Sequence, residues 1–152
     1  MASQKKFAVS REVNAPLEVV YSILADYRGG HPRILPRPPF VGLTVEQGGF
    51  GSGTVIRVGM RVLGKEQFFL ATVTEPVPGR VLMETTDTGY VTTFSVDPAG
   101  ADGVRVTITT ELNRRAGLLE TIEFALMSRW LRPVYGKELD LLADFAAGRP
   151  RA

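Results

Sequence analysis

The feature that most constrains this chain is a change in the spacing of its apolar residues near residue 112. Between residues 40 and 112, apolar and polar side chains alternate in short segments that are separated by turn sequences. Alternation of this kind is typical of β-strands that bury one face. Beyond residue 112 the apolar residues recur at intervals of three and four, which predicts one long helix. The sequence therefore indicates an α+β fold in which a helix covers a sheet.

The predicted strands follow one another closely along the chain. Residues 5–13 form a first strand, a short helix runs from about residue 17 to 25, and Pro36-Arg37-Pro38-Pro39 prevents a longer helix beyond it. Parallel strands need connections of about a dozen residues or more, and only short turns follow, so we expect an antiparallel meander. Its six strands are predicted at residues 40–46, 56–62, 69–74, 80–86, 90–96 and 104–112.

The C-terminal helix is predicted to cover the apolar face of this sheet of about seven strands. Pro133 and Gly136 interrupt it, which predicts a kink near residues 129–136. Glu120, Glu123 and Lys137 mark a more polar side. The apolar side consists of Leu119, Ile122, Leu126, Trp130, Val134, Leu141 and Phe145.

Composition narrows the possible functions. The 152 residues suit one domain, which we assign to residues 1–152 with a flexible tail at 148–152. The absence of cysteine excludes disulfides and thiolate metal sites. The net charge is only +2 and the basic residues are scattered, which argues against nucleic-acid binding. No signal sequence or membrane span is recognisable, so we expect a cytoplasmic protein.

Two features look like chemical motifs. Gly48-Gly49-Phe50-Gly51-Ser52-Gly53 resembles a phosphate loop, but a strand follows it and the Lys-Ser/Thr pair is missing, so a hairpin loop is predicted. His31 is the only histidine, and its imidazole could contact a ligand or serve as an acid or base near neutral pH. One histidine does not make a typical zinc site, and no metal or cofactor is expected.

Several polar residues lie in or beside the predicted strands. Arg57 and Arg61 alternate with the apolar residues and are expected to point to solvent, as are Glu66 and Glu84. If the strand were reversed locally, Arg57 would instead be a buried cation that suits an acidic ligand group. Tyrosine hydroxyls could also orient a ligand in an apolar site, although such tyrosines are more often core residues; the candidates are Tyr21, Tyr90 and Tyr135.

The order of motifs resembles the START-like (SRPBCC, Bet v 1-like) superfamily, and its polyketide cyclase/dehydratase branch most closely. The resemblance covers about residues 5–147 and departs where the family often has a Trp, near Ile34 or Leu35, because the only Trp here is Trp130. It is carried by Ala15-Pro16, Val20-Tyr21, Leu24, Asp26-Tyr27, Pro32-Arg33-Ile34-Leu35-Pro36, the turn within residues 71–81, and Gly103-Val104-Arg105-Val106-Thr107.

The resemblance implies a helix-grip fold, in which a curved sheet wraps around the long helix and encloses an apolar cavity. We expect binding or transport of a small hydrophobic ligand, such as a lipid, a quinone or a polyketide-like molecule. A cyclase, aromatase or dehydratase enzyme and a protein-interaction module remain alternatives, and either a monomer or a homodimer is compatible. The expected ligand-binding residues are Tyr27, His31, Ile34, Leu35, Val58, Met60, Phe69, Met83, Tyr90, Phe94, Phe124, Met127, Trp130 and Leu131.

Overall fold

The computed structural model describes residues 5–113 and 117–148, so most of the expected tail lies outside the described residues. The predicted succession of a strand, a short helix, six strands and a long helix is confirmed, and a second short helix follows the first. The elements are β1 (Lys5–Val13), α1 (Leu17–Ala25), α2 (Gly30–Ile34), β2 (Phe40–Gln47), β3 (Val55–Val62), β4 (Lys65–Val77), β5 (Val81–Thr86), β6 (Tyr90–Ala99), β7 (Gly103–Leu112) and α3 (Leu118–Ala146).

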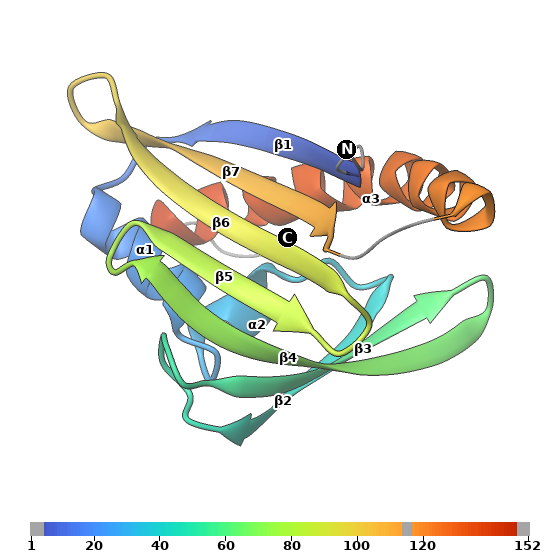
Figure 1. Cartoon of the computed structure of the whole chain (residues 1–152). Coiled ribbons are helices and arrows are strands. Elements are labelled where there is room, and N and C mark those ends of the chain that lie inside the picture. The colour runs from blue at the N-terminus through green and yellow to red at the C-terminus, as the bar shows by residue number, and fades with distance from the viewer. Residues whose placement is uncertain (1–4, 114–116, 149–152) are drawn as a thin grey trace.

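All seven strands form one antiparallel sheet in the order β1-β7-β6-β5-β4-β3-β2 (Figure 1). The meander from β2 to β7 follows from its short connections, as the sequence predicted. The β3–β4 turn needs a residue with positive φ, and Gly64 adopts a φ of 80° there without a steric penalty. The first strand pairs with the last one, so β1 and β2 form the two edges of the sheet.

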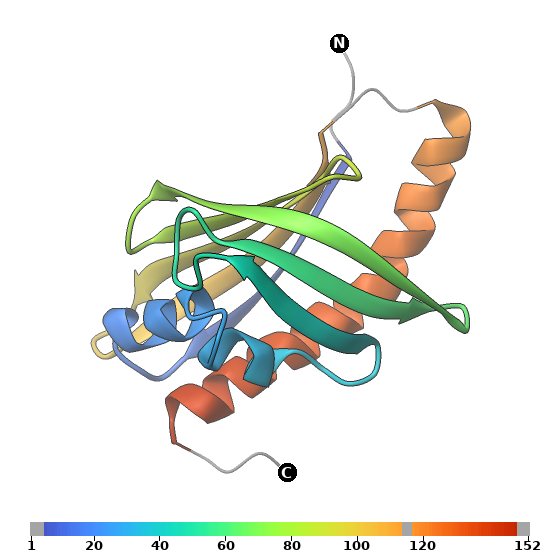
Figure 2. The same cartoon turned by 90° about the horizontal axis from the view of Figure 1, so that it is seen from below.

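The three helices lie on one side of the curved sheet (Figure 2). The main sheet contacts of α3 are with β1, and it also packs on α1, α2 and β7. This arrangement is the helix-grip fold that was expected. Because α3 packs mainly at the β1 edge, the inner faces of the middle strands look toward the helices across the interior.

The long helix buries a different face from the one that the apolar pattern indicated. Its buried residues include Phe124, Leu131, Tyr135, Leu139 and Leu142, and the helix continues through Pro133 (Figure 2). The prediction is wrong for the N-terminal half, because the interior positions there carry fewer large aliphatic side chains than the outer ones. The outer side chains left exposed are Leu119, Ile122, Leu126 and Trp130.

No described helix combines the length and apolar character needed to span a membrane.

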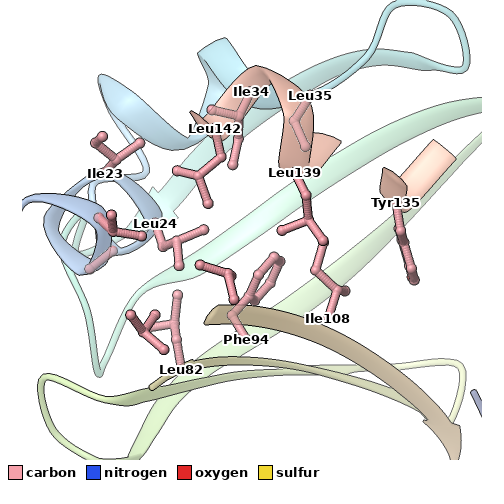
Figure 3. Packing of buried hydrophobic residues seen from close by; sticks show 14 of the residues in the cluster. Ile23, Leu24, Ile34, Leu35, Leu82, Phe94, Ile108, Tyr135, Leu139 and Leu142 are labelled. Atoms are coloured by element: carbon pink, nitrogen blue, oxygen red, sulfur yellow. The ribbon is translucent and has the colours of Figure 1, made fainter. Parts of the chain in front are cut away.

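A core of aliphatic and aromatic residues joins the helices to the sheet (Figure 3). Leu139 and Leu142 of α3 meet Leu24 of α1 and Leu82 and Ile108 of the strands, and all five are fully buried. Burying one such side chain stabilises the fold by about 1.5–3 kcal/mol. This core anchors the C-terminal half of α3 and therefore fixes the residues that this half projects into the interior.

The arginines of β3 point to the outer face of the sheet, as predicted. Arg57 Nε lies 3.0 Å from Glu46 Oε1, and Arg61 Nη2 lies 2.9 Å from Glu66 Oε2, at exposed positions. The outward orientation expected for Glu66 is therefore also confirmed. The alternative in which Arg57 is a buried cation for an acidic ligand group is wrong, because the register of β3 places Ile56 and Val58 inside instead.

Candidate functional site

The turn between α1 and α2 directs His31 into the interior. The Asp26 carboxylate accepts hydrogen bonds from the backbone N–H groups of Gly29 and Gly30, at 3.0 and 3.1 Å. A side chain at Gly30 would bring a Cβ to within 2.8 Å of the Ile23 carbonyl oxygen, so this close packing of α2 on α1 requires glycine. The compact turn leaves His31 only 2% exposed.

The glycine-rich segment is the hairpin loop between β2 and β3, as predicted. It fastens the end of α1, because the N–H of Tyr27 donates to the Gly49 carbonyl at 2.9 Å and the N–H of Gly51 donates to the Ala25 carbonyl at 3.0 Å. These two bonds hold the backbone on either side of Asp26. The loop therefore has a structural role here: it positions the tyrosine that begins the polar cluster described next.

Tyr27, His31 and Glu84 form a buried polar cluster. The Tyr27 hydroxyl donates a hydrogen bond to Glu84 Oε2 at 2.6 Å, and His31 Nε2 lies 3.7 Å from the same oxygen. The Tyr27 and His31 rings stack with centroids 4.5 Å apart, and the Phe94 ring meets His31 edge-on at 5.3 Å. Three of these four residues were expected to bind ligand, and the structure brings them together.

Glu84 was expected to point outwards and Met83 inwards, and both orientations are wrong. Successive side chains of a strand point to opposite faces. Leu82 is fully buried and Glu84 contacts Tyr27 inside the fold, so Met83 between them belongs to the outer face, where it pairs with Thr93. The pattern misled because apolar residues occupy both faces of β5.

The hydrogen bond of His31 to the backbone fixes its tautomer. Its Nδ1 lies 2.7 Å from the Leu24 carbonyl oxygen, which can only accept, so Nδ1 carries a hydrogen. The other nitrogen, Nε2, then faces Glu84. As a neutral ring it presents a lone pair to the interior, and as an imidazolium it forms an ion pair with the carboxylate. His31 can thus accept or hold a proton at this position.

A fourth titratable group, Glu138, enters the same region from α3. It is only 2% exposed, and it makes no hydrogen bond with any residue in the described part of the chain. Burial raises the pKa of its carboxyl well above the ordinary value, and the negative charge of Glu84 raises it further. The neutral acid is therefore favoured, and its O–H is available as a donor.

The Glu138 carboxyl also borders accessible space. Every fully enclosed side-chain nitrogen or oxygen of the described residues has a hydrogen-bond partner. Because the Glu138 carboxyl has no hydrogen-bond partner among the described residues, we infer that its oxygens belong to the small part of the residue that remains accessible. Glu84 also keeps 14% of its side chain exposed although it points between the helices and the sheet. Both carboxyl groups thus retain unused hydrogen-bonding capacity.

The tyrosines around the cluster are held as neutral donors. Burial raises the pKa of Tyr27 well above its ordinary value, and the Glu84 charge adds to this effect. Burial likewise raises the pKa of Tyr135. The Tyr135 hydroxyl lies 2.7 Å from Thr110 Oγ1, which lies 2.9 Å from Thr92 Oγ1. This hydroxyl chain links α3 to β7 and β6 and satisfies the polar groups beside the cluster.

The other expected ligand-binding residues divide into three groups. Ile34, Leu35, Val58, Phe124 and Leu131 are buried in the core. Trp130 is 39% exposed and belongs to the outer side of α3. The third group packs against the core from the interior while staying partly exposed, and these residues are Met60, Phe69, Tyr90 and Met127.

Sequence reasoning missed Glu84 and Glu138 as site residues. The only available signal for Glu138 was its spacing from Tyr135, Leu139 and Leu142, which places it on the buried face of α3. No group of three or more His, Asp or Glu side chains suited to a metal ion occurs within residues 5–113 and 117–148. The hydrogen bonds of Tyr27, His31 and Glu84 bring proton donors and acceptors together at the edge of an apolar interior.

Comparisons with known proteins agree with this architecture. The model of the family described as polyketide cyclase/dehydrase and lipid transport matches residues 4–146. The solution structure of the KanY protein is similar at a TM-score of 0.77 and 26% identity, covering 97% of this chain and 99% of that one. No curated protein matches the sequence.

Two further solved structures share the fold. The Zhui aromatase/cyclase from Streptomyces sp. R1128 is similar at a TM-score of 0.74 and 20% identity, with 99% of this chain and 98% of that one covered. A START superfamily protein from Mycobacterium smegmatis gives a TM-score of 0.64 and 18% identity, with 96% of each chain covered. These likenesses confirm the START-like resemblance of the sequence at the level of fold.

Proposed function

Because the chain belongs to the polyketide cyclase/dehydrase and lipid transport family, we propose that it binds a small hydrophobic ligand in the interior between the sheet and α3. The ligand's apolar body lies against the inner faces of β3, β4 and β6 and the facing side of α3. Its polar end reaches the cluster of Tyr27, Glu84 and Glu138. Affinity comes mainly from burial of apolar surface, at about 25 cal/mol per Å².

The observation that carries this proposal is the buried carboxyl of Glu138, which has no hydrogen-bond partner in the part of the chain that the structure describes. A polar group that loses most of its water without gaining a partner destabilises the fold, by up to about 1–3 kcal/mol when the water is lost completely. Titratable groups kept in such a setting cluster at functional sites. The partly exposed apolar residues of the interior support the same reading, because Met60, Phe69, Tyr90 and Met127 lie on inward faces yet are not fully covered.

The proposal is tested by titrating the protein with a neutral fluorescent apolar dye, N-phenyl-1-naphthylamine. Phe69 points into the interior and its neighbour Phe68 points away from it, so the strand offers a matched pair. The Phe69→Asp change places a charge beside the bound dye and should lower its affinity at least about tenfold. The Phe68→Asp control should leave the affinity within about twofold. Equal effects of the two changes, or no binding by the unmodified protein, would contradict the proposal.

A second candidate is an enzyme of cyclase or dehydratase type, and the acid–base cluster favours it. His31 Nε2 can accept a proton, and the protonated Glu138 can donate one, next to the same carboxylate. A polyketide-like chain held there would undergo proton transfer at a carbonyl or hydroxyl. In that case Glu138→Gln and His31→Gln would abolish turnover of the substrate while leaving its binding within about threefold. Loss of binding together with turnover would favour the pure binding role.

A further inference from the structure

The described part of the polar cluster contains no buried lysine or arginine. The buried residues of the described chain that carry a titratable charge are Glu138 and His31, and neither lysine nor arginine is among them. Glu84 adds a second carboxyl that faces the same space. A ligand that presents a carboxylate or phosphate here would meet the like charge of Glu84, with no lysine or arginine among the buried described residues to compensate it. The interior therefore disfavours anionic ligand groups.

The free hydrogen-bonding capacity of the cluster is mostly acceptor capacity. Glu84 uses one lone pair of Oε2 for Tyr27, which leaves the rest of its carboxylate open. Glu138 has all of its lone pairs free of described partners. His31 turns Nε2 toward Glu84, because Nδ1 is committed to Leu24. A group with several N–H donors and a positive charge satisfies all three residues together.

We propose that the interior site binds a hydrophobic molecule that carries an aliphatic amine, with the ammonium group between Glu84 and Glu138. This inference rests on the proposed function and specifies the polar end of its ligand. The two carboxyls come from β5 and α3, so the amine also bridges the sheet and the long helix. The phenol of Tyr27 holds Glu84 in place through the 2.6 Å bond.

Binding of the ammonium form is coupled to proton release. The neutral Glu138 acid gives its proton to solvent, and the resulting carboxylate pairs with the ammonium, so one proton leaves for each ligand bound. The titratable groups that interact with Glu138 are Glu84 of β5, Tyr27 after α1 and Tyr135 of α3, and His31 of α2 faces Glu84. Affinity for the amine therefore rises with pH.

The test uses three probes with one ring system and different polar ends, namely 2-(2-naphthyl)ethylamine, 2-(2-naphthyl)ethanol and 2-naphthylacetate. Calorimetric titrations in buffers of different ionisation enthalpy report both affinity and protons released. At pH 8 the amine should bind at least about tenfold more tightly than the alcohol, and the acetate most weakly. Affinity for the amine should rise up to about tenfold per pH unit for each proton released, whereas affinity for the alcohol should change much less.

Variants test whether the preference for the amine comes from the carboxyl groups of Glu138 and Glu84. Glu138→Gln keeps the shape of the side chain, and it should lower amine affinity at least about tenfold and remove one released proton. Its affinity for the alcohol should stay within about threefold. Glu84→Gln should lower the affinity for the amine by a similar factor. The control is Glu75→Gln, at the partly buried hydrogen-bond partner of Tyr21, and it should leave the affinity for the amine unchanged.

The outcomes separate the two proposals. If the alcohol binds but the amine gains nothing over it, or if Glu138→Gln leaves amine affinity unchanged, the amine inference is wrong and the binding function stands. Preference for the acetate would overturn the inference in the same way. If none of the three probes binds the unmodified protein, the proposed function fails, and the inference fails with it.

Discussion

The hydroxyl of Tyr27 donates a hydrogen bond to Glu84 Oε2 at 2.6 Å, and this bond joins the helical layer to β5 across the interior. Tyr27 is held from behind by the glycine-rich loop, through its backbone N–H and the Gly49 carbonyl. Glu84 is thereby fixed beside His31. The geometry of the whole cluster therefore depends on a bond between segments that are far apart in the sequence.

Replacing Tyr27 with phenylalanine removes this bond without changing the ring. Because the acceptor is a carboxyl group in a largely buried setting, we expect the free energy of unfolding to fall by about 1.5–3 kcal/mol. Urea denaturation measures the change. Tyr21→Phe is a matched control, because Tyr21 also donates to a glutamate but Glu75 lies nearer the surface, and its effect should be smaller. An equal or larger loss in the control would contradict the assignment.

Glu138 should make stability depend on pH. Its pKa is raised in the folded protein, so the folded state holds the proton more tightly than the unfolded chain does. The resulting stability is fully present below the ordinary carboxyl value of about 4.5 and is lost as the pH rises toward the folded-state pKa. The loss is at most about 1.4 kcal/mol per pH unit.

The Glu138→Gln variant tests this pH dependence, because the amide does not titrate. The difference in unfolding free energy between variant and parent should grow in favour of the variant from pH 5 to pH 8. Thermal unfolding at a series of pH values measures it. A difference that stays constant across this range would show that Glu138 does not carry a raised pKa in the folded protein.

The hydroxyl chain beside the cluster should also stabilise the fold. Tyr135→Phe removes the bond to Thr110 but keeps the stacking of the ring on Phe7, whose centroid lies 5.6 Å away. We expect a loss of about 0.5–1.5 kcal/mol, typical of a neutral hydrogen bond. In a double-mutant cycle with Thr110→Val, the two losses should not add, since each change removes the same bond. Additive losses would contradict a direct interaction.

The structure and the apolar pattern of the sequence assign different faces of α3 to the core, and two leucine-to-alanine changes test which face is buried. Leu139 is fully buried, and truncation to alanine should cost about 2–5 kcal/mol. Leu126 is exposed, and Leu126→Ala should change the unfolding free energy by no more than about 0.5 kcal/mol. Chemical denaturation of the two variants compares them directly. A large loss of unfolding free energy in Leu126→Ala would contradict the observed burial and would support the helix face that the apolar pattern predicted.

Much of the fold could be predicted because its signals are local. Turn residues and alternation located the strands within a few residues, and short connections required the antiparallel order. The bounds of the first strand, Lys5–Val13, were obtained directly from its spacing. The family resemblance then indicated how the helix lies on the sheet, which periodicity alone does not determine.

The site was only partly predictable, because its key contacts join distant segments. Tyr27, His31 and Phe94 were candidates from their residue types and from the family pattern. Glu84 was missed because apolar residues lie on both faces of β5, so alternation did not reveal which face is inside. Glu138 was missed because a glutamate on a helix is normally assigned to solvent. Only the packing of α3 shows that its position is buried.

The most direct test of ligand binding in the interior is a methyl NMR titration of protein labelled at isoleucine and leucine methyl groups, with 2-(2-naphthyl)ethanol as the probe. Binding in the interior should produce saturable shifts, together with probe-to-methyl Overhauser effects, at buried methyls, above all those of Leu82, Ile108 and Leu131. The methyls of Leu63 and Leu126 should stay unchanged, because they lie on the surface. Shifts confined to these surface methyls, or the absence of any saturable shift, would contradict an interior binding site.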